Sequence, residues 1–214
     1  PALASSMKSG ALLTDVASTK QKVIDTIAEP LRDSDDLTYI PTHPMAGSEK
    51  RGPRNARETL FEGSVCLFTP LPDTPLDPLK TLTSMWEELG ATVRCVSPAA
   101  HDRLVACISH LPHLAAAALI RTVNSEQGEL AGGGLIDTTR VASGDPRLWR
   151  DICSTNAEEI DRALGKFASE IEKLRKTIRN RDFEDLQETL ANAKERRDSL
   201  VAARRNRRDH DSSQ

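Results

Sequence analysis

Residues 64–98 read SVCLFTPLPDTPLDPLKTLTSMWEELGATVRCVSP and decide the fold. Short runs of apolar and β-branched residues, 64–70 and 91–96, stand at the two ends of this stretch and are bounded by Gly or Pro, which predicts strands. Between them, residues 79–89 predict a helix that Gly90 ends as its C-cap. Strands separated by a helix predict a mostly parallel sheet.

The same alternation extends toward the start of the chain. Two further strands are expected at residues 11–16 and 37–42, with a helix over 18–27 between them. A dinucleotide-binding sheet opens with a strand, a Gly-rich turn and a helix, but no GxGxxG motif occurs here. We therefore expect the later strands of such a sheet, in a chain that is the later part of a longer protein.

From Ser97 onward the pattern predicts only helices. Ser97 and Pro98 are typical of an N-cap followed by a first helical turn. The helix that they open is expected to run toward Val123, with a kink at Pro112.

The end of the chain predicts two long amphipathic helices. Residues 155–158, TNAE, have the form of a capping box. Apolar residues then recur every three or four positions over 155–180 and again over 183–203, on either side of a turn at 180–182. A hairpin with an apolar stripe on each helix exposes a patch that monomers rarely tolerate, so we expect a homodimer.

The fold class expected is therefore α/β followed by all-α, with domains at residues 1–97 and 98–214. The composition, 38% hydrophobic and 29% charged, is that of a soluble globular protein, and the net charge of −3 argues against a nucleic-acid-binding surface. The most apolar segment, 104–120, contains two histidines, so we expect no membrane span. Four widely spaced cysteines without a CxxC pair predict reduced thiols and a cytoplasmic protein.

Polar residues follow two of the expected strands. Asp15 and Ser18 come after the first, and His43 comes after the second. Ligands of open α/β sheets bind at the carboxyl ends of strands, and a histidine can accept a hydroxyl proton near neutral pH. Two plainer interpretations stay open: Ser18 as a helix N-cap and His43 as a surface-loop histidine.

The helical half carries further ionisable residues. Asp102, His110 and His113 fall on one face of an apolar helix, where unpaired burial is costly. Two histidines three residues apart can share a metal ion, but a third ligand is missing, so we expect no metal. Arg140 suits a carboxylate, although ion pairs around a buried Trp149 are the plainer alternative. Together these residues point to a carboxylate-bearing substrate with a hydroxyl to be deprotonated, as in a dehydrogenase.

Five stretches resemble those of prephenate dehydrogenases, in the same order and at similar spacing. They are DVASTK (15–20), HPMAGSEK (43–50), HDRLVACISHLPH (101–113), GGLIDTTR (133–140) and DPRLW (145–149). The resemblance implies a Rossmann-type nicotinamide-binding domain followed by a helical dimerisation domain. It also implies oxidative decarboxylation of prephenate to 4-hydroxyphenylpyruvate, with hydride transfer to NAD or NADP, in tyrosine biosynthesis.

The resemblance further implies roles for individual residues. His43 would be the catalytic base, Ser18 would orient the reacting hydroxyl and His43 near the nicotinamide, and Arg140 would bind a substrate carboxylate. The substrate pocket implied consists of Ser48, His110, His113, Gly133 and Trp149. An ionic network of Glu49, Asp102 and Asp137 would gate access to it. Asp15 and Ser18 would contact the cofactor.

Three alternatives remain beside this interpretation. The substrate is arogenate instead of prephenate, the chain is a truncated, non-catalytic dimeric module that binds an aromatic effector such as tyrosine, or the protein is a 3-hydroxyacid-type dehydrogenase. Feedback by tyrosine is a further expectation. NAD is the expected cofactor and NADP the alternative, because the residue that reads the ribose 2′ position lies in a part of the fold that this sequence does not contain.

Overall fold

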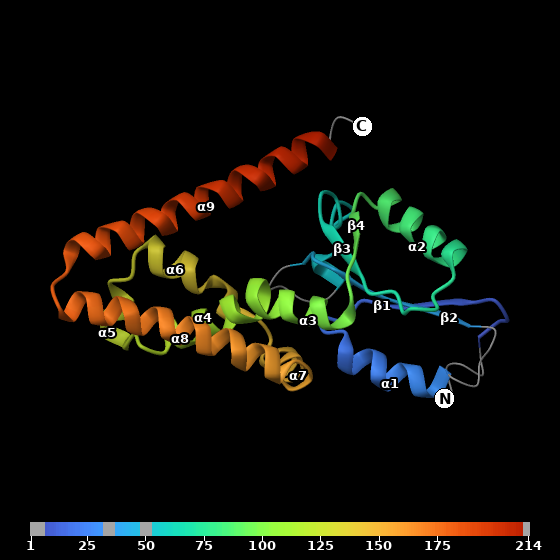
Figure 1. Cartoon of the computed structure of the whole chain (residues 1–214), viewed down its shortest axis with the longest axis horizontal. Helices are drawn as coiled ribbons and strands as arrows, with labels where there is room; N and C mark the ends of the chain where they lie inside the picture. Colours follow the sequence, from blue (N-terminus) through green and yellow to red (C-terminus); the bar gives the residue numbers. More distant parts are fainter. Residues whose placement is uncertain (1–6, 32–36, 48–52, 212–214) are drawn as a thin grey trace. The chain divides into compact units, whose positions relative to one another are not determined.

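The computed structural model describes residues 7–31, 37–47 and 53–211. The chain divides into two compact units, one that ends at Ala163 and one that begins at Leu164. The first unit holds a β-sheet and a group of helices, and the second holds two long helical segments (Figure 1).

The sheet has the strand order β1-β2-β3-β4. Its strands are β1 (Leu12–Asp15), β2 (Thr38–Pro44), β3 (Val65–Phe68) and β4 (Thr92–Cys95). All four expected strands are confirmed. β1 pairs with β2 and β3 with β4 in parallel, but β2 and β3 are antiparallel, so the sheet is mixed. Parallel strands are usually joined through an α-helix, and the described residues between β2 and β3 form only a short 3₁₀ turn, Pro53–Asn55.

Helices cover the sheet on both sides. α1 (Gln21–Leu31) follows β1, and α2 (Leu76–Glu88) lies on the opposite side of the sheet (Figure 1). The core between α2 and the sheet consists of Ile40, Cys66, Phe68, Leu82, Trp86 and Ala91. Gly90 ends α2 as expected: its φ is +81° and its N–H donates to the Glu87 carbonyl.

A second group of helices begins at Ser97. Its side chain accepts a hydrogen bond from the Ala100 N–H at the start of α3 (Pro98–Val105), which confirms the predicted N-cap. A π-helical turn, Ala106–His110, joins α3 to α4 (Leu111–Ile120). Proline lacks an N–H and collides with the carbonyl four residues before it, so the distortion expected at Pro112 takes the form of a widened turn just before it.

The stretch Pro98–Ile120 is long and apolar enough, by length and composition alone, to count as a candidate membrane span within the described residues. Our sequence interpretation of residues 104–120 did not anticipate this. Several of its polar side chains, including His101, Asp102 and His110, are buried inside the first unit.

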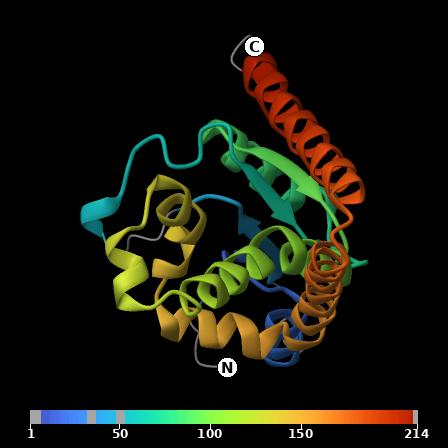
Figure 2. The same ribbon diagram turned by 90° about the vertical axis from the view of Figure 1, so that its left-hand side faces the viewer.

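The remaining helices of the first unit lie beside α3 and α4 (Figure 2). They are α5 (Ser125–Glu129), α6 (Gly133–Thr139), the 3₁₀ turn Arg140–Ser143, α7 (Pro146–Thr155) and the start of α8 (Ala157–Arg179). The predicted capping box does not form, because Thr155 is the last residue of α7 and its hydroxyl donates to the Asp151 carbonyl. Asn156 instead separates the end of α7 from the start of α8.

The second unit contains the rest of α8 and α9 (Phe183–Asp211). The predicted turn is confirmed: Arg181 has a φ of +57°, and the Thr177 hydroxyl donates to the Asp185 carboxylate across it at 2.9 Å. Apolar side chains remain exposed along both helices, namely Phe167, Ile171, Ile178, Phe183, Leu190 and Leu200.

Candidate functional site

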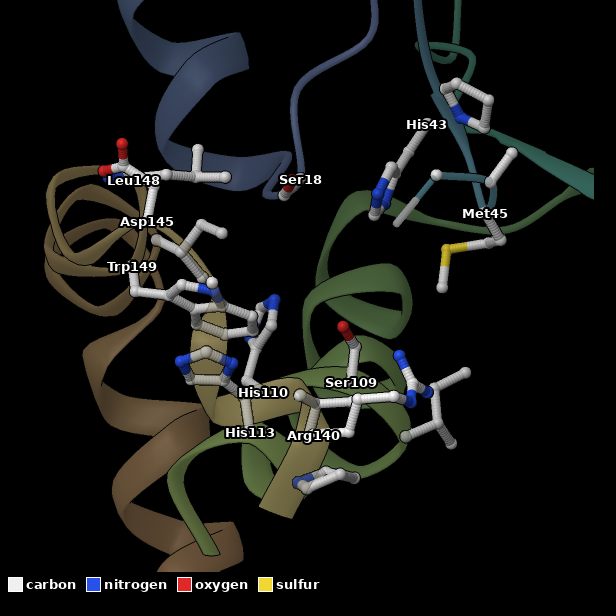
Figure 3. A pocket seen from close by; sticks show the side chains of 18 residues that line it. Ser18, His43, Met45, Ser109, His110, His113, Arg140, Asp145, Leu148 and Trp149 are labelled. Atoms are coloured by element: carbon white, nitrogen blue, oxygen red, sulfur yellow. Dashed lines mark hydrogen bonds between the residues drawn. The ribbon is translucent and has the colours of Figure 1, made fainter. Parts of the chain in front are cut away.

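A cavity of about 540 Å³ lies in the first unit, next to the carboxyl ends of β1 and β2. Six of the residues singled out in the sequence line it together: Ser18, His43, His110, His113, Arg140 and Trp149. Figure 3 shows Ser18 and His43 on one side and His110, His113 and Trp149 on the other. Because β1 and β2 are parallel, the residues that follow them meet at one edge of the sheet.

A buried polar network holds the turn between β1 and α1. The Asp15 carboxylate accepts hydrogen bonds from the Ala17 N–H at 2.9 Å and the Tyr39 hydroxyl at 2.7 Å, and it pairs with the Lys20 ammonium at 2.5 Å. Lys20 is fully buried, and this burial lowers its pKa despite the bond to Asp15. The Asp15 carboxylate is thus engaged inside the protein, where it supports the turn that carries Ser18.

The N-terminus of α1 is capped by a residue from another helix. Asp102 of α3 accepts hydrogen bonds from the backbone N–H groups of Lys20 and Gln21, at 2.8 and 2.9 Å. The N-cap interpretation of Ser18 is therefore wrong, since a carboxylate more than eighty residues away takes that place. Burial raises the pKa of Asp102, but hydrogen bonds from His101 and from these N–H groups outweigh this effect, so its pKa is lowered.

His43 lies at the end of β2 and is only 8% exposed, so the surface-loop interpretation is wrong. Its Nδ1 is 2.9 Å from Nε2 of His101, and Nδ1 of His101 is 2.8 Å from Oδ1 of Asp102. Burial, reinforced by the charges of His101 and Lys20, lowers the pKa of His43 to about 3. At neutral pH the ring is uncharged, and Nε2 is the nitrogen left to reach a ligand.

His110 is oriented by Asn156. The Asn156 amide nitrogen donates to the Asp102 carbonyl at 2.9 Å and lies 3.3 Å from Nδ1 of His110. Burial lowers the pKa of His110 to about 4, so the ring is neutral. Because Nδ1 accepts from Asn156, the ring proton sits on Nε2. This buried Nε2 has no hydrogen-bond partner in the described part of the chain, which leaves a donor at the cavity wall.

An aromatic wall closes the opposite side of the cavity. The His113 ring stacks on Trp149, and the His110 ring meets the same indole edge-on with centroids 6.0 Å apart. His113 is also hydrogen-bonded to the backbone of Val141, and burial lowers its pKa. Trp149 thus contacts two histidine rings of the cavity.

Other expected site residues have different surroundings. Gly133 and Asp137 lie on the exposed surface of α6 and are not among the lining residues. The hydrogen bonds of the Asp102 side chain go to α1 and His101, where the resemblance implied an ionic network around Arg140. Ser48 and Glu49 lie outside the described residues. Among the residues described, His, Cys, Asp and Glu form no group of three or more that could hold a metal ion.

Three residues of the site were missed by our sequence reasoning. His101 was not distinguished from its helix, Asn156 was taken as part of a capping box, and Gly144 was not considered. Each acts through a partner that lies far away in the sequence or on another element, so no local pattern marks it.

The cavity therefore offers a neutral histidine acceptor, a histidine N–H donor, an arginine and an aromatic wall. These groups suit an anionic ring compound with a hydroxyl: the histidine accepts a proton, the guanidinium binds a carboxylate and the stacked rings contact the flat ring.

Comparisons with known proteins agree with this architecture. Residues 1–95 match the family described as prephenate dehydrogenase, nucleotide-binding domain, and residues 97–192 match prephenate dehydrogenase, dimerization domain. The prephenate dehydrogenase of Bacillus subtilis (strain 168) is 35% identical over 195 residues, which cover 88% of this chain and 52% of that protein. The chain thus spans about half the length of this curated relative.

Two solved structures are also similar. The prephenate dehydrogenase from A. aeolicus, in complex with hydroxyphenyl propionate and NAD+, is 32% identical with a TM-score of 0.84; the match covers 92% of this chain and 70% of that one. Synechocystis arogenate dehydrogenase is 31% identical with a TM-score of 0.77, and the match covers 93% and 73% of the two chains. The α/β part followed by helices is accordingly a Rossmann-type fold with a helical domain, and the chain belongs to the prephenate dehydrogenase family.

Proposed function

We propose that the whole protein catalyses the oxidative decarboxylation of prephenate to 4-hydroxyphenylpyruvate, with NAD as hydride acceptor, in tyrosine biosynthesis. The observation that carries this proposal is that His43, which is buried and neutral, lines the same cavity as Arg140. The ligand of the A. aeolicus structure, hydroxyphenyl propionate, combines a ring hydroxyl and a carboxylate. These are the two groups that His43 and Arg140 would recognise.

His43 acts as the general base of this reaction. Its Nε2 accepts the proton of the ring hydroxyl while the carbon that bears this hydroxyl loses a hydride. The bond between the ring and its carboxylate breaks, carbon dioxide leaves, and the electron pair of that bond makes the ring aromatic. The ring oxygen then takes its proton back from His43, which restores the hydroxyl of 4-hydroxyphenylpyruvate and the neutral histidine. Since aromatisation drives the step, the protein supplies mainly positioning and one proton acceptor.

Residues of the cavity hold the substrate. Arg140 binds a carboxylate, and the N–H at Nε2 of His110 donates to an oxygen of the substrate. The stacked rings of His113 and Trp149 form the wall against which the substrate ring lies. We keep Ser48 and Gly133 as further substrate contacts, and Glu49 and Asp137 as residues that control access.

The residues present fit the nicotinamide end of a dinucleotide. Ser18 lines the cavity with His43 at the carboxyl ends of two parallel strands, where such cofactors bind. We therefore assign Ser18 to the cofactor and Asp15 to the support of the turn that carries it. The bound nicotinamide would supply the hydride acceptor. NADP is the alternative cofactor.

We assign residues 1–97 to nucleotide binding and residues 98–214 to substrate binding and assembly. The exposed apolar side chains of α8 and α9 support a homodimer, because a second copy of the chain would cover them. The match of residues 97–192 to a dimerization domain supports the same assignment.

Arogenate is the second candidate substrate, favoured by the similarity to the Synechocystis arogenate dehydrogenase. The test is to assay the whole protein with prephenate and with arogenate, each with NAD and with NADP, while following reduced cofactor and released carbon dioxide. We expect turnover with prephenate and NAD, and inhibition when tyrosine is added. A whole, folded protein that turns over neither substrate but binds tyrosine would support the effector-binding module instead.

A further inference from the structure

Three side chains form a row from the cavity into the protein interior. His43, which lines the cavity, contacts His101 at 2.9 Å, and His101 contacts the Asp102 carboxylate at 2.8 Å. His101 is fully buried and Asp102 is 4% exposed, so neither contact competes with solvent. His43 belongs to β2, whereas the other two residues lie on α3.

The chemistry of the groups decides where the protons lie. An ionised carboxylate only accepts hydrogen bonds, so the ring nitrogen of His101 that faces Asp102, Nδ1, carries a proton. In a neutral His101, Nε2 is then an acceptor, and the nitrogen of His43 that faces it, Nδ1, must donate. His43 consequently has its proton on Nδ1 and a free electron pair on Nε2.

We propose that Asp102 and His101 are positioning residues that hold His43 in the tautomer whose Nε2 accepts the substrate proton. This inference rests on the proposed role of His43 as the base. It gives Asp102 a function in which Arg140 takes no part. It also assigns a function to His101, for which the resemblance had implied no individual role.

The same carboxylate is fixed from a second direction. The backbone N–H groups of Lys20 and Gln21 donate to its two oxygens and tie it to the N-terminus of α1. These donors hold the carboxylate in its ionised form, which is the form that the row requires. They also connect the base to the chain segment that carries Ser18, so one buried group orients both sides of the reacting centre.

The row has a further consequence when His43 takes up a proton. The new positive charge lies at one end of a chain of hydrogen bonds that ends in a negative carboxylate, which favours it. His101, Lys20 and His110 oppose this charge electrostatically, and Asp102 favours it. Asp102 is therefore the titratable group that assists proton uptake by His43, and His101 links the two by hydrogen bonds.

The first experiment reads the tautomer directly. Nitrogen-15 and proton NMR of the histidine rings in the ligand-free protein should show His43 with its proton on Nδ1 and a bare Nε2. In His101→Leu the acceptor is lost, and both tautomers of His43 should be populated. In His101→Gln the amide oxygen can take the place of Nε2, and the original tautomer should return. A proton on Nε2 of His43 in the unmodified protein would overturn the proposal.

The second experiment measures the consequence for turnover in the whole protein. We expect His101→Leu to lower kcat by about 10- to 100-fold, with KM changed little, because the base is misoriented while the binding groups remain. His101→Gln should recover most of this loss. Equal losses in both variants, or no loss in His101→Leu, would contradict the proposal.

These outcomes separate the inference from the function on which it rests. If the unmodified whole protein turned over neither prephenate nor arogenate, the proposed function would fail, while the NMR result would still report whether His101 sets the tautomer of His43. Asp102→Asn is a poor substitute for these variants, because it also removes an acceptor from the N-terminus of α1.

Discussion

The rings of His113 and Trp149 are stacked, with centroids 3.5 Å apart and 11° between their planes. Gly144 lies against this pair. A Cβ atom at position 144 would collide with Nε1 of Trp149 and would lie 2.9 Å from Cε1 of His113. The backbone there has an ordinary φ of −64°, so space, and not backbone conformation, requires glycine.

Gly144→Ala should therefore disturb the aromatic wall. We expect KM for prephenate to rise by about tenfold or more and the free energy of unfolding to fall by about 1–3 kcal/mol, as in other overpacked sites. Steady-state kinetics and urea unfolding measure the two effects. The matched control is Gly165→Ala on α8, where a Cβ meets nothing within 4 Å. An unchanged KM in Gly144→Ala would show that the stack does not shape the substrate site.

Replacement of His43 tests the base. His43→Asn should lower kcat by about 10²- to 10⁴-fold with little change in KM, because general base catalysis contributes about this much. Steady-state kinetics of the whole protein with prephenate is the measurement. A variant that retains the original kcat would rule out His43 as the base.

Arg140 should affect binding more than turnover. Arg140→Gln removes a guanidinium that can hold a carboxylate with two parallel hydrogen bonds, so KM for prephenate should rise sharply. Arg140→Lys should recover only part of the loss, since a point charge lacks the fork geometry. Arg150, which is exposed and paired with Asp151, offers the control Arg150→Gln with an unchanged KM. A loss confined to kcat would assign Arg140 a different role.

The buried histidines should make the fold sensitive to acid. Burial lowers the pKa of His43 to about 3 and that of His110 to about 4, whereas both titrate near pH 6.5 in an unfolded chain. Below about pH 6.5 the unfolded chain binds more protons than the folded one, so stability is complete above this pH and decreases toward the folded values. The urea midpoint should fall between about pH 7 and about pH 5.

The His43→Asn variant provides the comparison for this pH dependence. It lacks one of the histidines whose pKa burial lowers, so the fall of its urea midpoint over the same pH interval should be smaller. A midpoint of the unmodified protein that does not change over this interval would contradict the assignment of two buried, neutral histidines.

The exposed apolar side chains of the last two helices should mediate dimerisation. Light scattering at micromolar concentration should give the mass of a dimer. We expect its interface to bury more than about 2,000 Å² in total, as in obligate dimers. Ile171→Glu places a charge among these side chains and should weaken the dimer, whereas Lys173→Gln, at an exposed polar position, should not. A folded, helical sample of monomer mass would refute this prediction.

Local features of the fold follow from the sequence alone. The four strands and the helix that ends at Gly90 were predictable because alternation of apolar residues and Gly or Pro boundaries act over a few residues. Ser97 and Pro98 at the start of α3 belong to the same class, since a cap and a first turn need no distant partner. His43 was singled out because it follows a strand.

Tertiary contacts decided the features that combine distant residues. Thr155 has the sequence of an N-cap, yet it ends α7, where its hydroxyl bonds the helix backbone. The real cap of α1 is Asp102, which comes from another helix. Short-range propensities are weak, so a buried carboxylate that finds two backbone donors outweighs the local preference of Ser18.

The tautomer of His43 depends entirely on the folded chain. His43 and His101 are 58 positions apart, and their rings meet only because the fold brings the end of β2 close to His101 of α3. Burial removes water as an alternative partner for the two rings, so a donor on one ring must face an acceptor on the other. The sequence therefore determined which chemical groups are present, and the tertiary contact between His43 and His101 decided which nitrogen of His43 is free to react.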